Sequence, residues 1–255
     1  MKNTQVYDYS GKELFHIHTH RCKHSSSEAD VEYVEKAIEL GARKIVFTDH
    51  APFPDNPFGN RMDIEELPEY IDSLAELKNT YKKKIEVRCG LEIEYLPSFR
   101  DYYLNLKKMD GIDLLMIGQH FFEHYEGNYS FSDEDKTNEF IGLCESMVQG
   151  INTGLFDVVA HPDRAFRRCR QFGHREIEAA KSVIWAAVSN GVYLEKNYSS
   201  VFLSPSLLGL GVVITFFTTF GAAAAAGAEP VPAFFGVSMI IIRFPSNTGN
   251  CSTFP

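Results

Sequence analysis

Hydrophobic and polar residues follow two alternating periods along the first 202 residues of the chain. Short apolar or β-branched runs, which are typical of buried strands, alternate with stretches in which apolar residues recur every three or four positions, as on one face of a helix. The pattern predicts strands at 13–18, 44–48, 85–92, 113–118, 156–160 and 192–196, and helices at 28–40, 64–83, 98–108, 133–149 and 175–189.

The order of these elements predicts the fold class. Strand and helix alternate at a spacing of roughly 30 residues, which indicates a parallel α/β sheet or a barrel. Gly41 follows the first helical pattern and is expected to end that helix. Asp63 and Glu66 have the spacing of a capping box at the start of the second helix, where Pro68 predicts an irregular first turn.

The charge distribution changes abruptly after residue 202. The whole chain contains 25 lysines and arginines and 34 aspartates and glutamates, but the segment 203–255 contains only Glu229 and Arg243. A folded domain rarely changes its surface chemistry in this way. We therefore expect a globular, functional domain at 1–202 and an atypical apolar tail at 203–255.

Three interpretations of the tail are open. The uncharged stretch 203–228 is long enough to cross a bilayer, for which about 20 apolar residues suffice, although glycines interrupt it. The tail can also be a divergent or frameshifted end, which we favour, or a buried and irregular final strand–helix unit. A membrane anchor is the least favoured of the three.

The overall composition is that of a globular protein, with 44% hydrophobic and 23% charged residues. The formal net charge of −9 and the pI of about 5.5 disfavour nucleic acid or an anionic membrane surface as a partner. Five cysteines without a regular spacing favour reduced thiols over a disulfide framework. The first residues have no apolar signal-peptide core, so we expect a cytoplasmic protein.

Histidines gather where the predicted strands end. Because the carboxyl ends of parallel strands form one face of a barrel or an open sheet, side chains that follow different strands meet there. Strand alternation also predicts that His16 and His18 point to the same side. Glu92 ends the third strand, and Asp49 precedes His50. Six of the nine histidines belong to this group, namely His16, His18, His24, His50, His120 and His161.

Imidazoles beside carboxylates predict a site for Zn, Mn or Fe rather than for Ca or Mg, which prefer oxygen ligands. Each residue alone has a plainer explanation, because a histidine at a strand end is often a hydrogen-bonded core residue. Glu92 and Glu94 are compatible with alternate faces of a strand, one of them exposed, and Cys22 is compatible with a packed thiol. The recurrence of polar residues at five strand ends nevertheless favours a polynuclear metal site.

The same residues resemble the motifs of a known family. Residues 16–19, followed by Cys22 and His24, resemble the first motif of the PHP (polymerase and histidinol phosphatase) superfamily. The opening motif and the segment FTDHAPFP are most similar to the histidinol-phosphatase branch. The resemblance implies a distorted (β/α)7 TIM-like barrel with a trinuclear metal centre. It covers about 14–200, with the second to fifth motifs at 47–50, 90–92, 118–120 and 160–163.

The resemblance also assigns ligands to up to three divalent transition metals. Glu92 is implied as a bridging residue, and Asp49 would orient a ligand rather than bind a metal. The family has a late strand that ends in an Asp and a His ligand, whereas this sequence has no Asp after Asp163 and no His after His174. The implied ligands are His16, His18 and Glu92 for one metal, His24 and His50 for a second, and Glu92, His120 and His161 for a third.

The implied activity is hydrolysis of a phosphate monoester, with L-histidinol phosphate and water giving L-histidinol and phosphate. Clustered cations suit this slow reaction, because they neutralise phosphate oxygens and lower the pKa of a bound water. Glu92, Asp49 and Arg164 are the candidate catalytic residues. Arg164 and, more weakly, Arg61 are candidate phosphate contacts, because a guanidinium forms paired hydrogen bonds with phosphate. Two alternatives are open: a phosphoesterase of the same family that acts on another small phosphate or a nucleotide, and an inactive, partly metallated scaffold.

Overall fold

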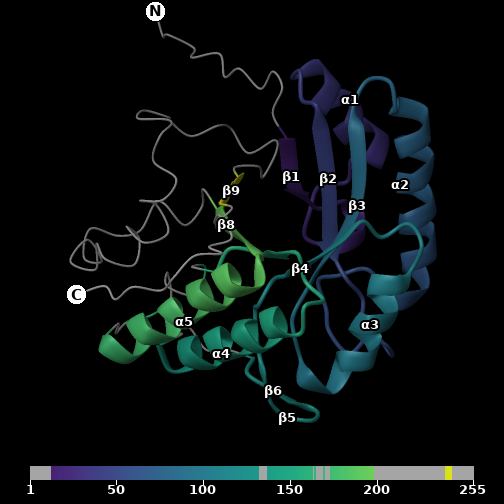
Figure 1. The fold of residues 1–255 in the computed structure, drawn as a ribbon. Coiled ribbons are helices and arrows are strands. Elements are labelled where there is room, and N and C mark those ends of the chain that lie inside the picture. Colours follow the sequence, from purple (N-terminus) through teal and green to yellow (C-terminus); the bar gives the residue numbers. More distant parts are fainter. Residues whose placement is uncertain are drawn as a thin grey trace, which may run out of the picture. The chain divides into compact units, whose positions relative to one another are not determined.

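A computed structural model describes residues 13–131, 137–162, 164, 169, 173–197 and 239–242 (Figure 1). The chain is a mixed α/β protein in which the first three strands pair in parallel, as do two later strands of the same sheet, while two short strands form an antiparallel hairpin. It divides into two compact units. Among the described residues, the first unit contains 13–93 and 101–116, and the second contains 94–100 and the described part of 117–197.

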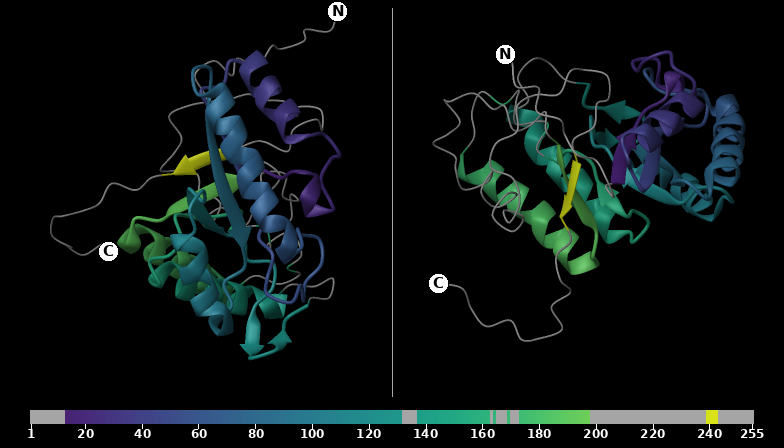
Figure 2. Two further views of the ribbon diagram at one scale, coloured as in Figure 1. Left: turned by 90° about the vertical axis from the view of Figure 1, so that its right-hand side faces the viewer. Right: turned by 90° about the horizontal axis from the view of Figure 1, so that it is seen from above.

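The first unit is built on parallel strands with helical connections. In chain order, the elements up to the end of the fourth strand are β1 (Glu13–Ile17), η1 (His20–Cys22), α1 (Asp30–Glu39), β2 (Lys44–His50), η2 (Ile64–Glu66), α2 (Leu67–Tyr81), β3 (Glu86–Ile93), η3 (Pro97–Phe99), α3 (Arg100–Lys108) and β4 (Leu114–Ile117), the η elements being 3-10 helices. Of these, η3, Arg100 and Ile117 belong to the second unit. The strands pair in the order β1-β2-β3-β4. α2 lies along β3 (Figures 1 and 2).

Both faces of β2 are buried, which explains why its sequence is a continuous apolar run instead of an alternating one. All residues from Ile45 to His50 are buried. α2 contributes the buried side chains of Tyr70 and Leu74, and the Tyr70 hydroxyl donates a hydrogen bond of 2.8 Å to the carbonyl of Gly90. Burial of an apolar side chain of this size contributes about 1.5–3 kcal/mol.

Gly90 in β3 has no room for a side chain. A Cβ atom there would lie 2.8 Å from Cγ of Leu114 and 3.0 Å from the carbonyl oxygen of Phe47. Because the carbonyl belongs to the backbone of β2, we expect Gly90→Ala to lower the free energy of unfolding by roughly 1–3 kcal/mol, measured by urea unfolding. Gly59→Ala is the control, because nothing lies within 4 Å of its Cβ position. Equal stability of the two variants would contradict this account of β3.

The second unit contains two packed helices and the later strands. Its further elements are β5 (Glu123–Tyr125), β6 (Asn128–Tyr129), α4 (Thr137–Asn152), β7 (Val158–Val159), α5 (His174–Asn190) and β8 (Tyr193–Asn197). α4 and α5 lie side by side (Figures 1 and 2). β7 and β8 pair in parallel, and the amide of Ala160 donates to the carbonyl of Ile117 at the end of β4. β9 (Met239–Ile242) follows β8 in the strand order.

The predicted strands and helices are confirmed, with boundaries shifted by a few residues. The capping box is also confirmed, since the amide of Asp63 donates to Oε2 of Glu66 at 2.7 Å. The irregular turn that Pro68 predicts is the 3-10 helix η2 before α2. The hairpin of β5 and β6 was not predicted, because strands of three and two residues are too short to show an alternating pattern.

No helix in the described part of the chain is long and apolar enough to cross a membrane. The predicted domain boundary at 202, the stretch 203–228 and the rest of the apolar tail lie outside the described residues, apart from β9.

Candidate metal centre

A buried carboxylate in the first unit faces three imidazoles. Oε2 of Glu92 lies 2.9 Å from Nε2 of His16 and 3.1 Å from Nε2 of His18. Nδ1 of His50 lies 3.6 Å from the same oxygen. The parallel register of β2 and β3 pairs His50 with Glu92, and Glu92 is fully buried. The structure therefore brings these four side chains together, as their places at strand ends predict.

His24 extends this group toward solvent. One nitrogen from each of His18, His24 and His50 lies within 4.8 Å of the other two, and His24 is exposed. Nδ1 of His24 lies 2.6 Å from the carbonyl oxygen of Cys22. Because a carbonyl only accepts, Nδ1 donates this hydrogen bond, and in the neutral imidazole Nε2 is then the nitrogen that can bind a metal.

His16 and His18 face the same carboxylate for a different reason from the one predicted. Strand alternation was the expected cause, but β1 ends at Ile17 and its pairing with β2 shifts between Leu14 and Ile17. His16 has a φ of 62°, in the left-handed region. A bulge in β1 therefore sets the direction of His16, and bulges commonly redirect a side chain next to a functional site. The two rings lie 5.0 Å apart.

Asp49 supports the loop that carries His18. Its carboxylate accepts hydrogen bonds from the amide of Thr19 at 2.5 Å and from the Thr19 hydroxyl at 2.7 Å, and the Cys22 thiol donates to it at 3.0 Å. Burial raises the pKa of Asp49, whereas the hydrogen bonds from Cys22 and Thr19 and the charge of His18 act in the opposite direction. Nδ1 of His18 lies 4.0 Å away. These contacts hold Asp49 against the loop of His18, while its role of orienting a ligand stays a prediction. Cys22 is buried, as a packed thiol would be.

Arg21 holds the same loop in place, a role that was not predicted from the sequence. Its guanidinium donates two hydrogen bonds of 2.9 Å to Asp30 of α1 and bonds of 2.8 and 3.0 Å to Glu69 of α2. The hydrogen bonds of the buried guanidinium therefore connect η1, which lies between His18 and His24, to both helices. No local pattern distinguishes such an arginine from a surface one, because its partners are distant in the sequence.

Arg61, the weaker candidate for a phosphate contact, is buried among aromatic rings. Its guanidinium carbon lies 5.4 Å from the ring centroid of Phe53 and 5.5 Å from that of Phe58. Nη1 donates a hydrogen bond of 3.1 Å to the carbonyl of Ala51, directly after His50. These contacts show Arg61 holding the end of β2, while its role toward phosphate stays a prediction.

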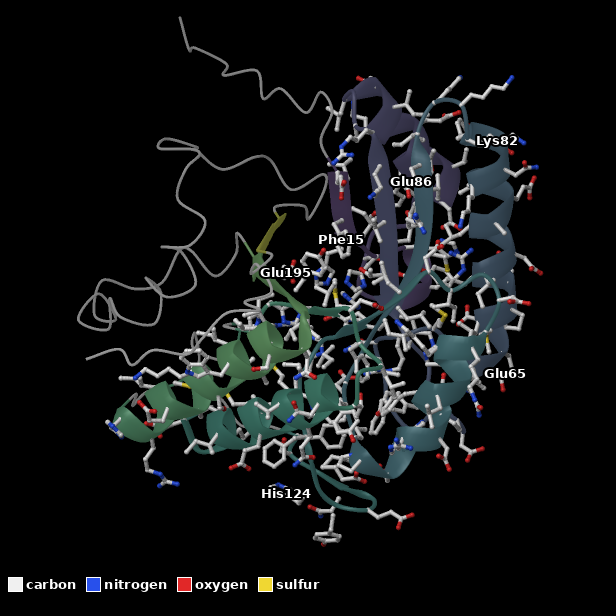
Figure 3. All side chains as sticks on the ribbon, in the orientation of Figure 1. Phe15, Glu65, Lys82, Glu86, His124 and Glu195 are labelled. Carbon is white, nitrogen blue, oxygen red and sulfur yellow. The ribbon has the colours of Figure 1, made fainter. Side chains whose placement is uncertain are left out.

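A second polar cluster lies in the second unit, where the rings of His120 and His161 are 5.1 Å apart. Nδ1 of His120 lies 2.8 Å from Oε1 of Glu94, and Nε2 lies 2.6 Å from Nη1 of Arg164. His161 has a φ of 27°, and its amide donates to Oε2 of Glu195 at 2.7 Å. Figure 3 labels Glu195, which lies on β8. The cluster thus combines two imidazoles with a guanidinium, and two carboxylates hold it in place.

Glu94 and Glu195 were missed as supporting residues. Glu94 is only 1% exposed, so the alternative in which one of Glu92 and Glu94 faces solvent is wrong. Glu195 is 3% exposed. A signal was available for Glu195, because a carboxylate inside the predicted strand 192–196 must find a donor when the strand is buried. Glu94 follows the predicted strand 85–92 and carried no such signal.

The donor atoms of both clusters fit divalent transition metals. Imidazole nitrogens and carboxylate oxygens suit Zn, Mn or Fe, whereas Ca requires a shell of oxygen ligands. In the first unit, three imidazoles lie around one fully buried carboxylate, and a buried charge of this kind requires a positive partner. In the second unit, a guanidinium already donates to Nε2 of His120, the atom with the electron pair that a metal would use.

Residues 15–199 match the family described as PHP domain. The chain belongs to the PHP domain family. This PHP chain is 31% identical over 171 residues to a Deinococcus radiodurans protein named "Probable histidinol-phosphatase", covering 62% of each protein. It is also 31% identical over 142 residues to the histidinol-phosphatase of Bacillus subtilis, covering 52% of this chain and 53% of the relative. The PHP chain thus matches about three fifths and about half of the length of these relatives.

A solved structure has the same fold as the PHP chain. It is the histidinol phosphate phosphatase of Lactococcus lactis in complex with zinc, L-histidinol and phosphate, with a TM-score of 0.55 and 23% sequence identity. The match covers 71% of each chain. This likeness establishes the α/β fold of the PHP chain.

Proposed function

We propose that this PHP chain is a metal-dependent phosphatase that converts L-histidinol phosphate and water to L-histidinol and phosphate. The observation that carries the proposal is the convergence of three imidazoles on one oxygen of the buried Glu92. The names of the two curated relatives support the substrate, as do the zinc, L-histidinol and phosphate in the related structure. We also propose that the parallel strands belong to a distorted (β/α)7 TIM-like barrel.

The proposed ligands are those that the family motifs imply. Glu92 would bridge two cations, because a carboxylate has two oxygens and several electron pairs. The ligand set comprises His16, His18, His24, His50, Glu92, His120 and His161, for up to three Zn, Mn or Fe ions.

Bound divalent cations would supply the main chemistry by neutralising phosphate oxygens, lowering the pKa of a water and stabilising the leaving alkoxide. The residues of the chain prepare the site for that chemistry. Asp49 and Cys22 hold the loop of His18 through the Thr19 hydrogen bonds. Arg164 would donate paired hydrogen bonds to a non-bridging phosphate oxygen pair, and Arg61 would make a weaker second contact.

Metal content and substrate preference test the proposal directly. Metal analysis of the purified full chain should find at least two transition-metal ions per chain. Phosphate release should be fastest with L-histidinol phosphate, compared with a nucleoside monophosphate and with p-nitrophenyl phosphate. A chain without bound metal would overturn the enzyme assignment, because its neutral imidazoles alone cannot activate water for this reaction. Preference for the nucleotide would instead support the alternative phosphoesterase.

A further inference from the structure

We infer that Glu94 is a positioning residue that holds the proton of His120 on Nδ1, so that the Nε2 electron pair, which accepts from Arg164 in this structure, can bind a cation that replaces the guanidinium. The inference rests on the proposed metal site but concerns a residue outside its ligand set. Its basis is a chain of contacts within the second unit, in which His120 lies between Glu94 and Arg164.

The two contacts of His120 determine which ring nitrogen carries the proton. Nη1 of Arg164 lies 2.6 Å from Nε2 of His120. A guanidinium has only donors, so Nε2 must accept this hydrogen bond and cannot carry a proton. The remaining nitrogen, Nδ1, therefore carries the proton and donates to Oε1 of Glu94 at 2.8 Å.

Burial makes the Glu94 contact strong and specific. Glu94 is 1% exposed, and the His120 side chain is 21% exposed. In such a low-dielectric environment, a hydrogen bond to an ionised carboxylate is stronger than in water. A carboxylate on one nitrogen also raises the basicity of the other nitrogen, which improves it as a metal ligand.

Gln119 holds the two backbone segments that carry Glu94 and His120. Its Oε1 accepts from the amide of Tyr95 at 2.9 Å, and its Nε2 donates to the carbonyls of Tyr95 at 3.2 Å and Phe121 at 2.5 Å. Tyr95 directly follows Glu94, and Gln119 directly precedes His120. The buried amide therefore fixes the register of the two segments, so that the contact between Glu94 and His120 does not depend on two freely moving side chains.

Two substitutions separate the roles of charge and hydrogen bonding. Glu94→Leu removes the carboxylate that accepts from Nδ1, so the ring loses the contact that orients it and raises the basicity of Nε2. We expect zinc affinity of the full chain, measured by competition with a chelator, to fall about 10–100-fold at one site. Glu94→Gln keeps an acceptor of the same size and should recover part of this affinity. Glu123→Gln is the matched control, because Glu123 lies in the same unit and bonds Ser98 rather than a histidine.

A second measurement reports the hydrogen bond itself. In NMR spectra of the zinc-loaded full chain with labelled histidine, His120 should give a low-field Nδ1 proton, assigned by its absence in His120→Gln. This resonance should move upfield in Glu94→Gln and disappear in Glu94→Leu, while Glu123→Gln leaves it unchanged. Unchanged zinc affinity together with an unchanged resonance in the Glu94 variants would overturn the inference.

Failure of this inference is distinguishable from failure of the proposed function. If the wild-type chain hydrolyses L-histidinol phosphate while the Glu94 variants bind zinc like the wild type, only the role of Glu94 is wrong. If zinc binding depends on Glu94 but no histidinol phosphate is hydrolysed, the substrate proposal is wrong and the role of Glu94 stands. A wild-type chain that binds no zinc would overturn both.

Discussion

Glu92→Gln is expected to abolish phosphate release and to remove bound metal at the same time. The substitution keeps the size of the side chain but replaces one carboxylate oxygen with an amide nitrogen, which cannot bind a cation. In the structure, one oxygen of Glu92 faces Nε2 of His16, Nε2 of His18 and Nδ1 of His50. Loss of a bridging ligand should therefore affect two metals. Mutation of a residue that only holds a metal ligand in place lowers metal affinity or activity about 10–100-fold. Because Glu92 is itself a proposed ligand, we expect kcat/KM to fall by more than about 100-fold.

Metal analysis and steady-state kinetics on the same preparation test this prediction. Glu86→Gln is the matched control, because Glu86 lies at the start of the same strand and pairs with Arg88 and Lys44 (Figure 3). This control should retain metal content and kcat/KM. Full metal stoichiometry in Glu92→Gln would refute the bridging role, even if activity were lost.

The strand ends were predictable because two independent patterns agree there. Continuous apolar runs such as 44–48 identify strands that are buried on both faces, and parallel strands bring their carboxyl ends to one edge. The sequence therefore placed His50 and Glu92 near each other, and the register of β2 and β3 pairs them. The same reasoning succeeded for His120 and His161, whose rings lie 5.1 Å apart.

The details that the sequence did not reveal depend on local backbone geometry or on distant partners. His16 adopts a positive φ at a bulge, and nothing in the residues 13–18 distinguishes this bulge from a regular strand. The contacts of Arg21 with Glu69 and of His161 with Glu195 join residues far apart in the chain. Such pairs become visible only when the fold has brought their elements together.

Arg164→Ala is expected to lower kcat/KM for L-histidinol phosphate about 100-fold while leaving metal content unchanged. Arg164 is exposed and lies beside His120, three residues after His161, which places its guanidinium next to a proposed metal ligand. Removal of one positioned donor from a developing oxyanion lowers rates by about 100- to 1,000-fold. Arg164→Lys keeps the charge but loses the paired donors, so it should recover only part of the loss.

The comparison of substrate and product binding shows whether Arg164 acts on phosphate. If the guanidinium binds a non-bridging oxygen, inorganic phosphate should inhibit Arg164→Ala more weakly than the wild type, and the loss should appear in kcat as well as in KM. Arg175→Ala is the matched control, because Arg175 is an exposed arginine in the first turn of α5. If phosphate inhibited the wild type, Arg164→Ala and Arg175→Ala equally, Arg164 would contact His120 but not the phosphate group. In that case, the phosphate contact would have to be sought elsewhere, beginning with Arg61.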